Sequence, residues 1–515
     1  MSIDDHQSDQ PNLNPWRTLV AMTGSLSMMM LDTTVVGVAL PTIQVDLHMS
    51  SAMAGWLVTS FVLTLACLLA IGGRLGDRFG RLRIYRVAVL AFAMASVWCG
   101  LSTSGWSMMA GRIVQGAAAA CMQPAATAIV IAAFPAGKRG MAMAMFFGIS
   151  LLFLVAGPII GGVVIETAGW PWIFFLNIPV AAVSLLLTIG ITGPFRRADA
   201  RAFDALGALL LLLGLPTLVL GLEWAAEPPP QMGWIARLLV LPGIMLTVGF
   251  ILRCLRCTSP LLNLNPLRDR VLLGESLVLM CLNVIMVGQS VYGIVYLQEV
   301  LGWSPLEAGL GGMALMIPVL VIIGPAGRMY DRRGARPLLK MALPLAILGL
   351  LIEVPALLLE SYPLLAVGMV LLGIGMTATT TPCNTDALSR ATGTQRGEVS
   401  GLIQTIRMLG ASLGIVLFTA AIALFMQYTV DHNDPAFTIH PEIASQALQG
   451  DLDAAEKLRA IAPKLAESIS DARRNGMATA FGVQVIIAGI AMCIALVWVH
   501  TLPPTSDTTK SEQGD

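Results

Sequence analysis

The chain has 515 residues, of which 56% are hydrophobic and 12% are charged, and its formal net charge is zero. A soluble protein usually carries about 25% charged residues, and a neutral chain lacks the basic excess that nucleic-acid binding requires. The composition, with a mean hydropathy of +0.77, therefore excludes a soluble globular protein and a nucleic-acid partner, and it indicates an integral membrane protein in a lipid bilayer.

Apolar stretches long enough to cross a membrane recur along the whole chain. A spanning helix needs about 20 mostly apolar residues. Such stretches occur at residues 17–40, 54–73, 84–103, 106–132, 141–165, 171–192, 203–223, 234–253, 271–297, 306–327, 338–359, 363–383, 397–427 and 475–500. We therefore predict an all-α protein with fourteen transmembrane helices, and the even number places both termini on the same side.

Basic and acidic residues alternate between the short loops. Loops after even-numbered spans hold basic residues such as Arg78, Lys138, Arg197, Arg256 and Arg332, whereas the intervening loops hold Asp46, Glu166, Glu227, Glu299 and Glu360. Lysine and arginine are retained on the cytoplasmic side of short loops. The alternation predicts that both termini are cytoplasmic.

Two basic loops resemble each other and indicate an internal repeat. Glycine, aspartate, arginine and glycine recur at the same offsets, as Gly73, Asp77, Arg78 and Gly80 in the first loop and as Gly327, Asp331, Arg332 and Gly334 in the second. Parallel halves of six helices account for such a repeat. We predict a cytoplasmic tail (1–16), a six-helix bundle (17–195), linkers with two additional helices (196–270), a second six-helix bundle (271–500) and a second tail (501–515).

The segment 428–474 is the one long outer loop. Pro441 and Gly450 bound a short predicted helix, and apolar residues then recur at helical spacing at Ala454, Leu458, Ile461, Leu465 and Ile469. The pattern predicts an extracytoplasmic helical hairpin. Its role is either that of a structured connector or a part in gating or substrate release.

Four motifs carry a resemblance to a known family. They are Leu31-Asp32-Thr-Thr-Val-Val-Gly37-Val-Ala-Leu-Pro41, the loop Gly73-x-x-x-Asp77-Arg78-x-Gly80-Arg81-x-Arg83, Arg112-x-x-Gln115-Gly116, and Gly157-Pro158-Ile-Ile-Gly161-Gly162. Over residues 16–500 the chain resembles the fourteen-spanner drug:proton antiporter family of the major facilitator superfamily. The resemblance implies the major facilitator fold, proton-driven export, proton coupling through Arg112, and an antiporter motif at Gly157, Pro158, Gly161 and Gly162.

Charged residues within the spans are the main candidates for proton coupling. Each costs about 2.5–3.5 kcal/mol at a helix centre, so it normally faces a partner or water. Asp32 and Arg112 have similar predicted depths in one bundle, where they either couple a proton to transport or form a static ion pair. Glu353 is either a second proton or cation site or a helix-end residue at the headgroups, and we expect Glu275 to be solvated.

Other polar residues have weaker functional interpretations. For substrate binding we consider Asp32, Met29, Gln123, Asn283, Gln289, Gln404 and Arg407, although such amides more often form hydrogen-bond bridges between helices than contacts with a ligand. For a conformational latch on the cytoplasmic side we consider Gly73, Asp77, Arg78, Gly80, Arg81, Asp331 and Arg332. The positive charges of these loops are also explained by topology, because they keep the loops on the cytoplasmic side. Gly157 and Gly161 share a helix face, which permits close packing whether or not it affects proton leak.

The sequence offers no enzymatic motif. It lacks a P-loop, an HExxH metal motif and a GxSxG nucleophile elbow, and the cysteine pair Cys254 and Cys257 lacks the further ligands of a zinc site. We expect no cofactor and no metal. The predicted function is a proton-coupled antiporter that exports amphipathic, cationic drugs across the cell inner membrane. Export of a single endogenous metabolite and proton-coupled symport are the alternatives.

Overall fold

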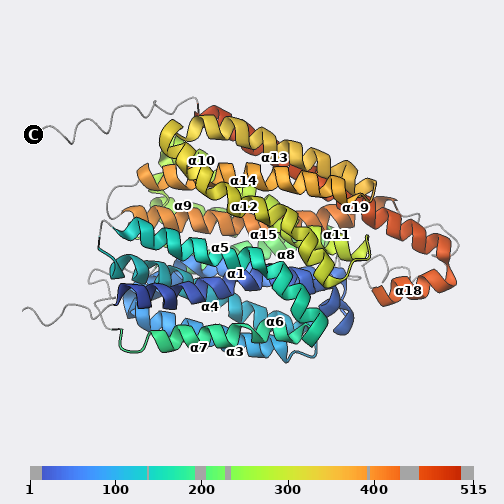
Figure 1. The fold of residues 1–515 in the computed structure, drawn as a ribbon, viewed down its shortest axis with the longest axis horizontal. Helices are drawn as coiled ribbons and strands as arrows, with labels where there is room; N and C mark the ends of the chain where they lie inside the picture. The colour runs from blue at the N-terminus through green and yellow to red at the C-terminus, as the bar shows by residue number, and fades with distance from the viewer. Residues whose placement is uncertain are drawn as a thin grey trace, which may run out of the picture.

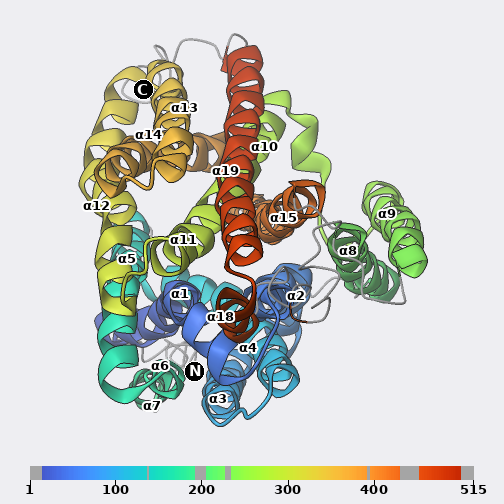
Figure 2. The same cartoon turned by 90° about the vertical axis from the view of Figure 1, so that its right-hand side faces the viewer.

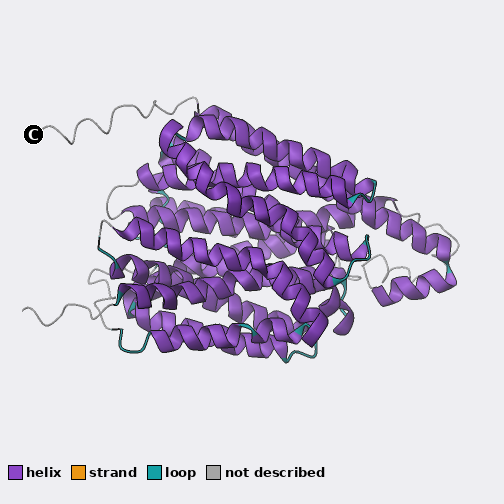
Figure 3. Ribbon diagram, in the orientation of Figure 1, coloured by secondary structure: helices purple, strands orange, loops and turns teal. Residues whose placement is uncertain are grey.

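All of the described secondary structure is helical. The computed structural model describes residues 14–135, 138–191, 204–226, 233–390, 395–429, 443 and 452–499. These residues form no strand (Figure 3). Thirteen of their helices are long and apolar enough to cross a membrane, and they run along the long axis of the molecule (Figure 1). The structure confirms the predicted all-α membrane fold.

The N-terminal half begins with the long helix α1. Its helices are α1 (Pro15–Asp46), α2 (Ser51–Phe79), α3 (Arg81–Gly100), α4 (Gly105–Ala133), α5 (Arg139–Ala168), α6 (Pro171–Phe175) and α7 (Asn177–Leu187). The sixth predicted span, 171–192, is the pair α6 and α7, a shorter apolar segment of Pro171–Leu187. The first predicted span ends at residue 40, whereas α1 continues through Pro41 and ends at Asp46.

The C-terminal half contains the second set of long helices. They are α10 (Arg270–Gly288), the π-helical turn η3 (Gln289–Gly293), α11 (Ile294–Glu299), α12 (Pro305–Arg333), α13 (Ala335–Leu358), α14 (Tyr362–Arg390), α15 (Gln395–Thr429) and α19 (Pro463–Val499). A short 3₁₀ helix, η2 (Asn265–Arg268), precedes α10. The ninth predicted span, 271–297, is therefore interrupted by a π-turn, a local widening that is frequent at functional sites.

The internal repeat is present in the helices themselves. The helices α2 and α12 have 29 residues each, and so do α4 and α14. The turns into α3 and α13 pass through Gly80 and Gly334, with φ of 99° and 72°. Only glycine adopts such values without strain. The fixed glycines of the two loop motifs are thus required by the backbone of these turns.

The two additional helices, α8 (Ala205–Ala226) and α9 (Gly233–Arg256), pack on each other at the side of the molecule (Figure 2). Leu211 and Leu215 of α8 belong to one buried cluster with Leu63 of α2 and Val416 of α15. The helix α2 belongs to the N-terminal half and α15 to the C-terminal half. Through this one cluster, α8 therefore contacts both halves.

An ion pair fastens α8 to α9. The Arg253 Nε atom donates to Asp204 Oδ1 at 2.7 Å, and the Gly207 amide donates to the same oxygen at 3.0 Å. Burial raises the pKa of Asp204, but these hydrogen bonds outweigh it and hold that pKa below its ordinary value. Asp204 therefore remains ionised at neutral pH and caps the start of α8.

The predicted hairpin consists of α18 (Leu452–Ile461) and the first turns of α19, and it projects beyond the bundle (Figure 1). Leu458, Leu465 and Ile469 form a buried cluster with Met426, as the helical spacing predicted. The prediction was wrong for Ile461, which is 50% exposed at the end of α18, and the Ala454 side chain falls outside the described set. Two ion pairs hold this part of α19 to the bundle, Arg473 to Glu299 at 2.7 Å and Arg474 to Glu360 at 2.6 Å. The predicted helix at 440–450 falls outside the described residues, apart from residue 443.

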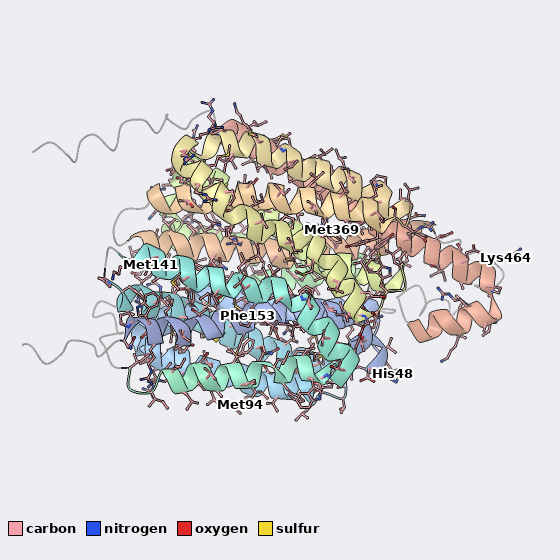
Figure 4. All side chains as sticks on the ribbon, viewed as in Figure 1. His48, Met94, Met141, Phe153, Met369 and Lys464 are labelled. Atoms are coloured by element: carbon pink, nitrogen blue, oxygen red, sulfur yellow. The ribbon has the colours of Figure 1, made fainter. Side chains whose placement is uncertain are left out.

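We call the end of the molecule that carries α18 the hairpin end and the end where α1 starts the tail end. In Figure 4, His48 lies at the hairpin end and Met141 at the tail end, with Phe153 between them. The tails 1–13 and 500–515 and the linker 192–203 lie outside the described residues, so the outer limits of the predicted domains stay predictions.

The two halves are in contact at the hairpin end and apart at the tail end. A Cβ atom on Gly162 of α5 would lie 2.5 Å from the Leu306 backbone of α12, whereas one on Gly148 would meet no described atom within 4 Å. Fourteen residues place Gly148 and Gly162 within about 40° of each other around α5. On α12, Gly309 is equally close to α5 and Gly327 meets nothing. The helices α5 and α12 therefore diverge towards the tail end.

Candidate functional site

The predicted acid–base pair of the N-terminal half is present and buried. Arg112 of α4 and Asp32 of α1 form an ion pair through Arg112 Nη1 and Asp32 Oδ2. Arg112 is 1% exposed and Asp32 is 4% exposed. The structure therefore brings these two residues together, as their similar predicted depths suggested.

The guanidinium of Arg112 has further partners. Its Nε atom donates to the Leu57 carbonyl at 3.0 Å, and Nη1 donates to Gln115 Oε1 at 2.9 Å. Its central carbon lies 4.3 Å from the centroid of the Phe61 ring, which adds a cation–π contact. Arg112 is therefore held in place even when Asp32 changes its charge.

The carboxylate of Asp32 has fewer partners. Besides Arg112, it accepts a weak hydrogen bond from Asn177 Nδ2 at 3.5 Å. The same Asn177 amide donates to Ser96 at 3.3 Å, and Gln115 donates to Ser96 at 2.8 Å. A polar network from four helices thus surrounds the ion pair, and protonation of Asp32 would remove the main electrostatic contact of its side chain.

A second carboxyl lies in the C-terminal half. Glu353 of α13 is 0% exposed and accepts a hydrogen bond from Gln289 Nε2 of the π-turn. Gln289 Nε2 also donates to Gln484 Oε1 of α19 at 3.1 Å. The position of Glu353 contradicts the headgroup interpretation, because its carboxyl lies inside the bundle.

The two halves have equivalent helix positions at their buried sites, but the residues at these positions differ in charge. Cys99 is residue 19 of α3 and Glu353 is residue 19 of α13, and each touches a glycine, Gly111 or Gly368, at residue 7 of the next helix. A Cβ on either glycine would lie 2.6 Å from that neighbour. The next residue is Arg112 in the first half and Met369 in the second. Among the described residues, Glu353 therefore has no cation beside it.

Of the neutral residues in the two networks, the sequence analysis singled out Gln289 but missed most of the others. Ser96, Asn177 and Gln484 were not singled out, and Gln115 entered only as part of a motif. All four are buried, with at most 1% of each residue exposed. Their shared signal is a polar residue within an apolar span, which is costly unless it has a hydrogen-bond partner.

The predicted substrate-binding residues are in different environments. Met29 is buried in the core and Gln123 is 7% exposed, with its Oε1 atom unpartnered within the described part of the chain. Asn283 is half-buried and donates to the Leu279 carbonyl of its own helix at 2.8 Å. Gln404 and Arg407 are half-buried on α15, and Arg407 Nε has no hydrogen-bond partner in the described chain. Of this set, the structure brings Gln289 together with Glu353.

The loop motif at the tail end forms a contact within one half. Asp77 accepts from Arg81 Nη2 at 2.8 Å and from Arg81 Nε at 3.0 Å. Asp77 thus binds the first residue of α3 rather than a helix of the other half in this conformation. Arg78 and Arg332 are exposed, and the Asp331 side chain falls outside the described set. The predicted latch stays a prediction.

The glycines of the predicted antiporter motif make close contacts in two directions. A Cβ atom on Gly157 or Gly161 would press on Thr34 or Val35 of α1, and one on Gly162 would press on α12. The Pro158 carbonyl lies directly against Gly309 of α12. The motif is therefore part of the closed contact at the hairpin end, where small residues permit close helix packing.

The prediction for Glu275 was wrong. This residue of α10 is 5% exposed instead of solvated. Its position one turn inside the helix suggested water contact, but the helices packed around α10 cover it. The described residues contain no group of three or more histidine, cysteine or acidic residues that could hold a metal ion.

Solved structures with the same fold are membrane transporters. One is a bacterial homologue of the human lysosomal transporter Spinster in an inward-facing and unoccupied conformation, with a TM-score of 0.65, 18% identity, and 95% of this chain and 98% of that chain covered. Another is an auto-inhibited peptide transporter of the POT family, with a TM-score of 0.63, 14% identity and coverage of 96% and 98%. At these identities the likeness shows the fold alone.

Sequence relatives carry names of resistance and export proteins. The tetracenomycin C resistance and export protein of Streptomyces glaucescens is 35% identical over 62% of this chain, and the chain spans 60% of that relative's length. The multidrug resistance protein Stp of Mycobacterium tuberculosis (strain CDC 1551 / Oshkosh) is 30% identical over 80% of this chain and 77% of its own length. The multidrug export protein EmrB of Escherichia coli (strain K12) is 30% identical over 61% and 63%.

A family model described as Major Facilitator Superfamily matches residues 22–415. That range contains the Asp32–Arg112 pair, both loop motifs and the contact of α5 with α12. The two repeated helical halves and their buried polar networks agree with this match. The chain is a membrane-spanning protein that belongs to the major facilitator superfamily.

Proposed function

We propose that this transporter is a proton-coupled antiporter that exports amphipathic, cationic drugs or toxic compounds from the cytoplasm by alternating access. The observation that carries the proposal is the buried ion pair of Asp32 and Arg112. The export and resistance proteins among the relatives support the same direction of transport.

The ion pair offers a physical route to coupling. In the present conformation Asp32 is matched by the charge of Arg112, and burial of both makes the loss of either charge costly. When the hairpin end opens, water and protons reach this depth, and protonation of Asp32 releases it from Arg112. Arg112 then keeps Leu57, Gln115 and the Phe61 ring as partners, so the helices stay together while α1 gains freedom.

The geometry of α5 and α12 supports alternating access. The halves are closed at the hairpin end by Gln298, which donates to the Val38 carbonyl at 2.9 Å, and by Glu166, which accepts from the Leu306 amide at 3.1 Å. They diverge at the tail end, at Gly148 and Gly327. With cytoplasmic termini, as the loop arginines indicate, this conformation faces the cytoplasm and receives the compound to be exported.

The proposed membrane rests on the family to which the chain belongs, and the proposed side of the termini rests on the loop arginines. We place the protein in the cell inner membrane as a multi-pass protein whose two termini are cytoplasmic, with protons, small drug-like molecules and lipid as its partners. The proton gradient supplies the energy, and no cofactor is needed.

Transport by reconstituted protein tests this function. Liposomes that contain the purified protein are loaded with ethidium, and a pH gradient is imposed. We expect gradient-dependent movement of ethidium with wild type and none with Asp32→Asn. Movement that persists in Asp32→Asn would assign proton coupling to another site. Wild type that moves no ethidium would contradict the cationic substrate class and leave export of a single endogenous metabolite as the alternative.

A further inference from the structure

A small pocket lies between the two halves, next to the hydrogen-bonded pair of Gln289 and Glu353. It is lined by Thr34 and Pro158 of the N-terminal half and by residues of the C-terminal half that include Gln289, Gly293, Met316 and Met369. Thr34 is two residues from Asp32, and Gln289 is the hydrogen-bond partner of Glu353. The pocket wall therefore touches the C-terminal network directly.

One polar atom in this wall lacks a partner. Gln289 is 2% exposed, and its Oε1 atom has no hydrogen-bond partner among the described residues. A Cβ atom on Gly293, which also lines the pocket, would lie 3.7 Å from this oxygen. Oε1 therefore lies at the pocket wall. A buried amide oxygen without a donor is costly, so this oxygen is suited to bind an N–H or O–H group that enters the pocket.

The Nε2 atom of the Gln289 amide already has hydrogen-bond acceptors, and these fix the orientation of the amide group. Gln484 Nε2 donates to the Ile285 carbonyl at 3.4 Å, so Gln484 Oε1 faces Gln289. That oxygen accepts one hydrogen of Gln289 Nε2 at 3.1 Å, and Glu353 Oε2 accepts the other. A backbone carbonyl thus sets the direction of the whole chain of hydrogen bonds, with Gln289 Oε1 towards the pocket and Nε2 towards Glu353.

We propose that Gln289 couples the two transported species: its Oε1 atom binds a hydrogen-bond donor of the substrate, such as an amine, while its Nε2 atom positions the carboxyl of Glu353. The inference rests on the proposed antiport and adds a substrate group and a positioning residue to it. A donor bound at Oε1 polarises the amide and strengthens the hydrogen bond from Nε2, which favours the ionised form of Glu353. Binding of the substrate therefore promotes release of the Glu353 proton, and Met316 and Met369 provide adaptable apolar walls.

Proton release on substrate binding tests the inference. Ethidium, whose exocyclic amines are donors, is added to purified protein in weakly buffered detergent solution, with its affinity measured by fluorescence and released protons by a pH indicator dye. We expect Gln289→Leu to bind ethidium about tenfold more weakly, the loss of one hydrogen bond to a charged or polar group. At saturating ethidium it should release as few protons as Glu353→Gln.

A second variant separates the pocket from the network. Gly293→Ala adds a methyl group at the wall, 3.5 Å from Met369 Cε, which is an ordinary contact. It should weaken ethidium binding and leave proton release at saturation intact, because the bond from Gln289 to Glu353 remains. Ser276→Ala in the adjoining helix α10 is the control, since its hydroxyl donates to the Leu272 carbonyl of its own helix, and it should match wild type.

The outcomes separate the inference from the function on which it rests. Wild-type affinity and proton release in Gln289→Leu, or unchanged affinity in Gly293→Ala, would overturn the role of Gln289 and leave antiport through Asp32 standing. Wild type that binds no ethidium would contradict both the proposed substrate class and this inference.

Discussion

Removal of either member of the Asp32–Arg112 pair should destabilise the protein, and removal of Arg112 should cost more. In Asp32→Asn, Arg112 keeps the Leu57 carbonyl at 3.0 Å, Gln115 Oε1 at 2.9 Å and the Phe61 ring. In Arg112→Met, which reproduces the Met369 of the other half, the remaining described partner of Asp32 is the Asn177 amide at 3.5 Å. The loss of stability should be larger in Arg112→Met, because the buried charge that remains, Asp32, has fewer hydrogen-bond partners than Arg112 has in Asp32→Asn.

The magnitudes follow from the burial of both side chains, which are at most 2% exposed. Removal of one partner from a buried ion pair costs about 3–5 kcal/mol. We expect Asp32→Asn near ~3 kcal/mol and Arg112→Met near ~5 kcal/mol on this scale. The double variant should cost less than the sum of the two, because it leaves no charge without its partner.

Reversible unfolding in mixed detergent micelles measures these free energies. Glu353→Gln is the matched control. It neutralises a buried carboxyl that has no cation among its described neighbours, and the amide oxygen of the new glutamine can still accept the hydrogen bond from Gln289. It should cost less than about 1 kcal/mol. Equal costs for the two single variants, or a double variant as costly as their sum, would refute the reasoning.

Three further predictions concern the closed end, the additional helices and the hairpin. Gly162→Val should collide with α12 and speed hydrogen exchange at the hairpin ends of α5 and α12, whereas Gly148→Val has free space in this conformation and should not. The loss of stability in Asp204→Asn should be the same at pH 5.5 and 7.5. Folding lowers the pKa of Asp204, so its contribution to stability is complete above the unfolded-state pKa and is lost only as the pH falls through the folded-state pKa. A loss of stability that differs between these two pH values would contradict this expectation. Arg473→Gln leaves Glu299 without its cation and should increase proteolysis of α18, whereas unchanged cleavage would show that the hairpin is held by its apolar cluster alone.

The topology was predictable because it depends on local composition. A span needs only length and apolarity, and all fourteen predicted stretches coincide with helices. The repeat was equally readable, since a glycine with positive φ is required at each of the two turns. The similar depths of Asp32 and Arg112 also followed from counting residues along helices.

Partners across helices were not predictable in the same way. The roles of Asn177 and Gln484 depend on how each helix is rotated about its axis, which packing decides, and a single sequence does not give that rotation. Glu275 was misplaced for the same reason, because distance from a helix end does not say which neighbours cover the residue. The π-turn at Gln289 has no pattern in the apolar stretch around it.

The direct test of antiport is to let the substrate drive the proton. Liposomes with the reconstituted transporter hold ethidium and a pH-sensitive dye, with no pH gradient and with the membrane potential clamped by potassium and valinomycin. Outward movement of ethidium should carry protons inwards, so we expect the lumen to become acidic with wild type and to keep its pH with Asp32→Asn. A lumen that becomes alkaline would show symport, and ethidium movement without any pH change would show that protons are not coupled to transport.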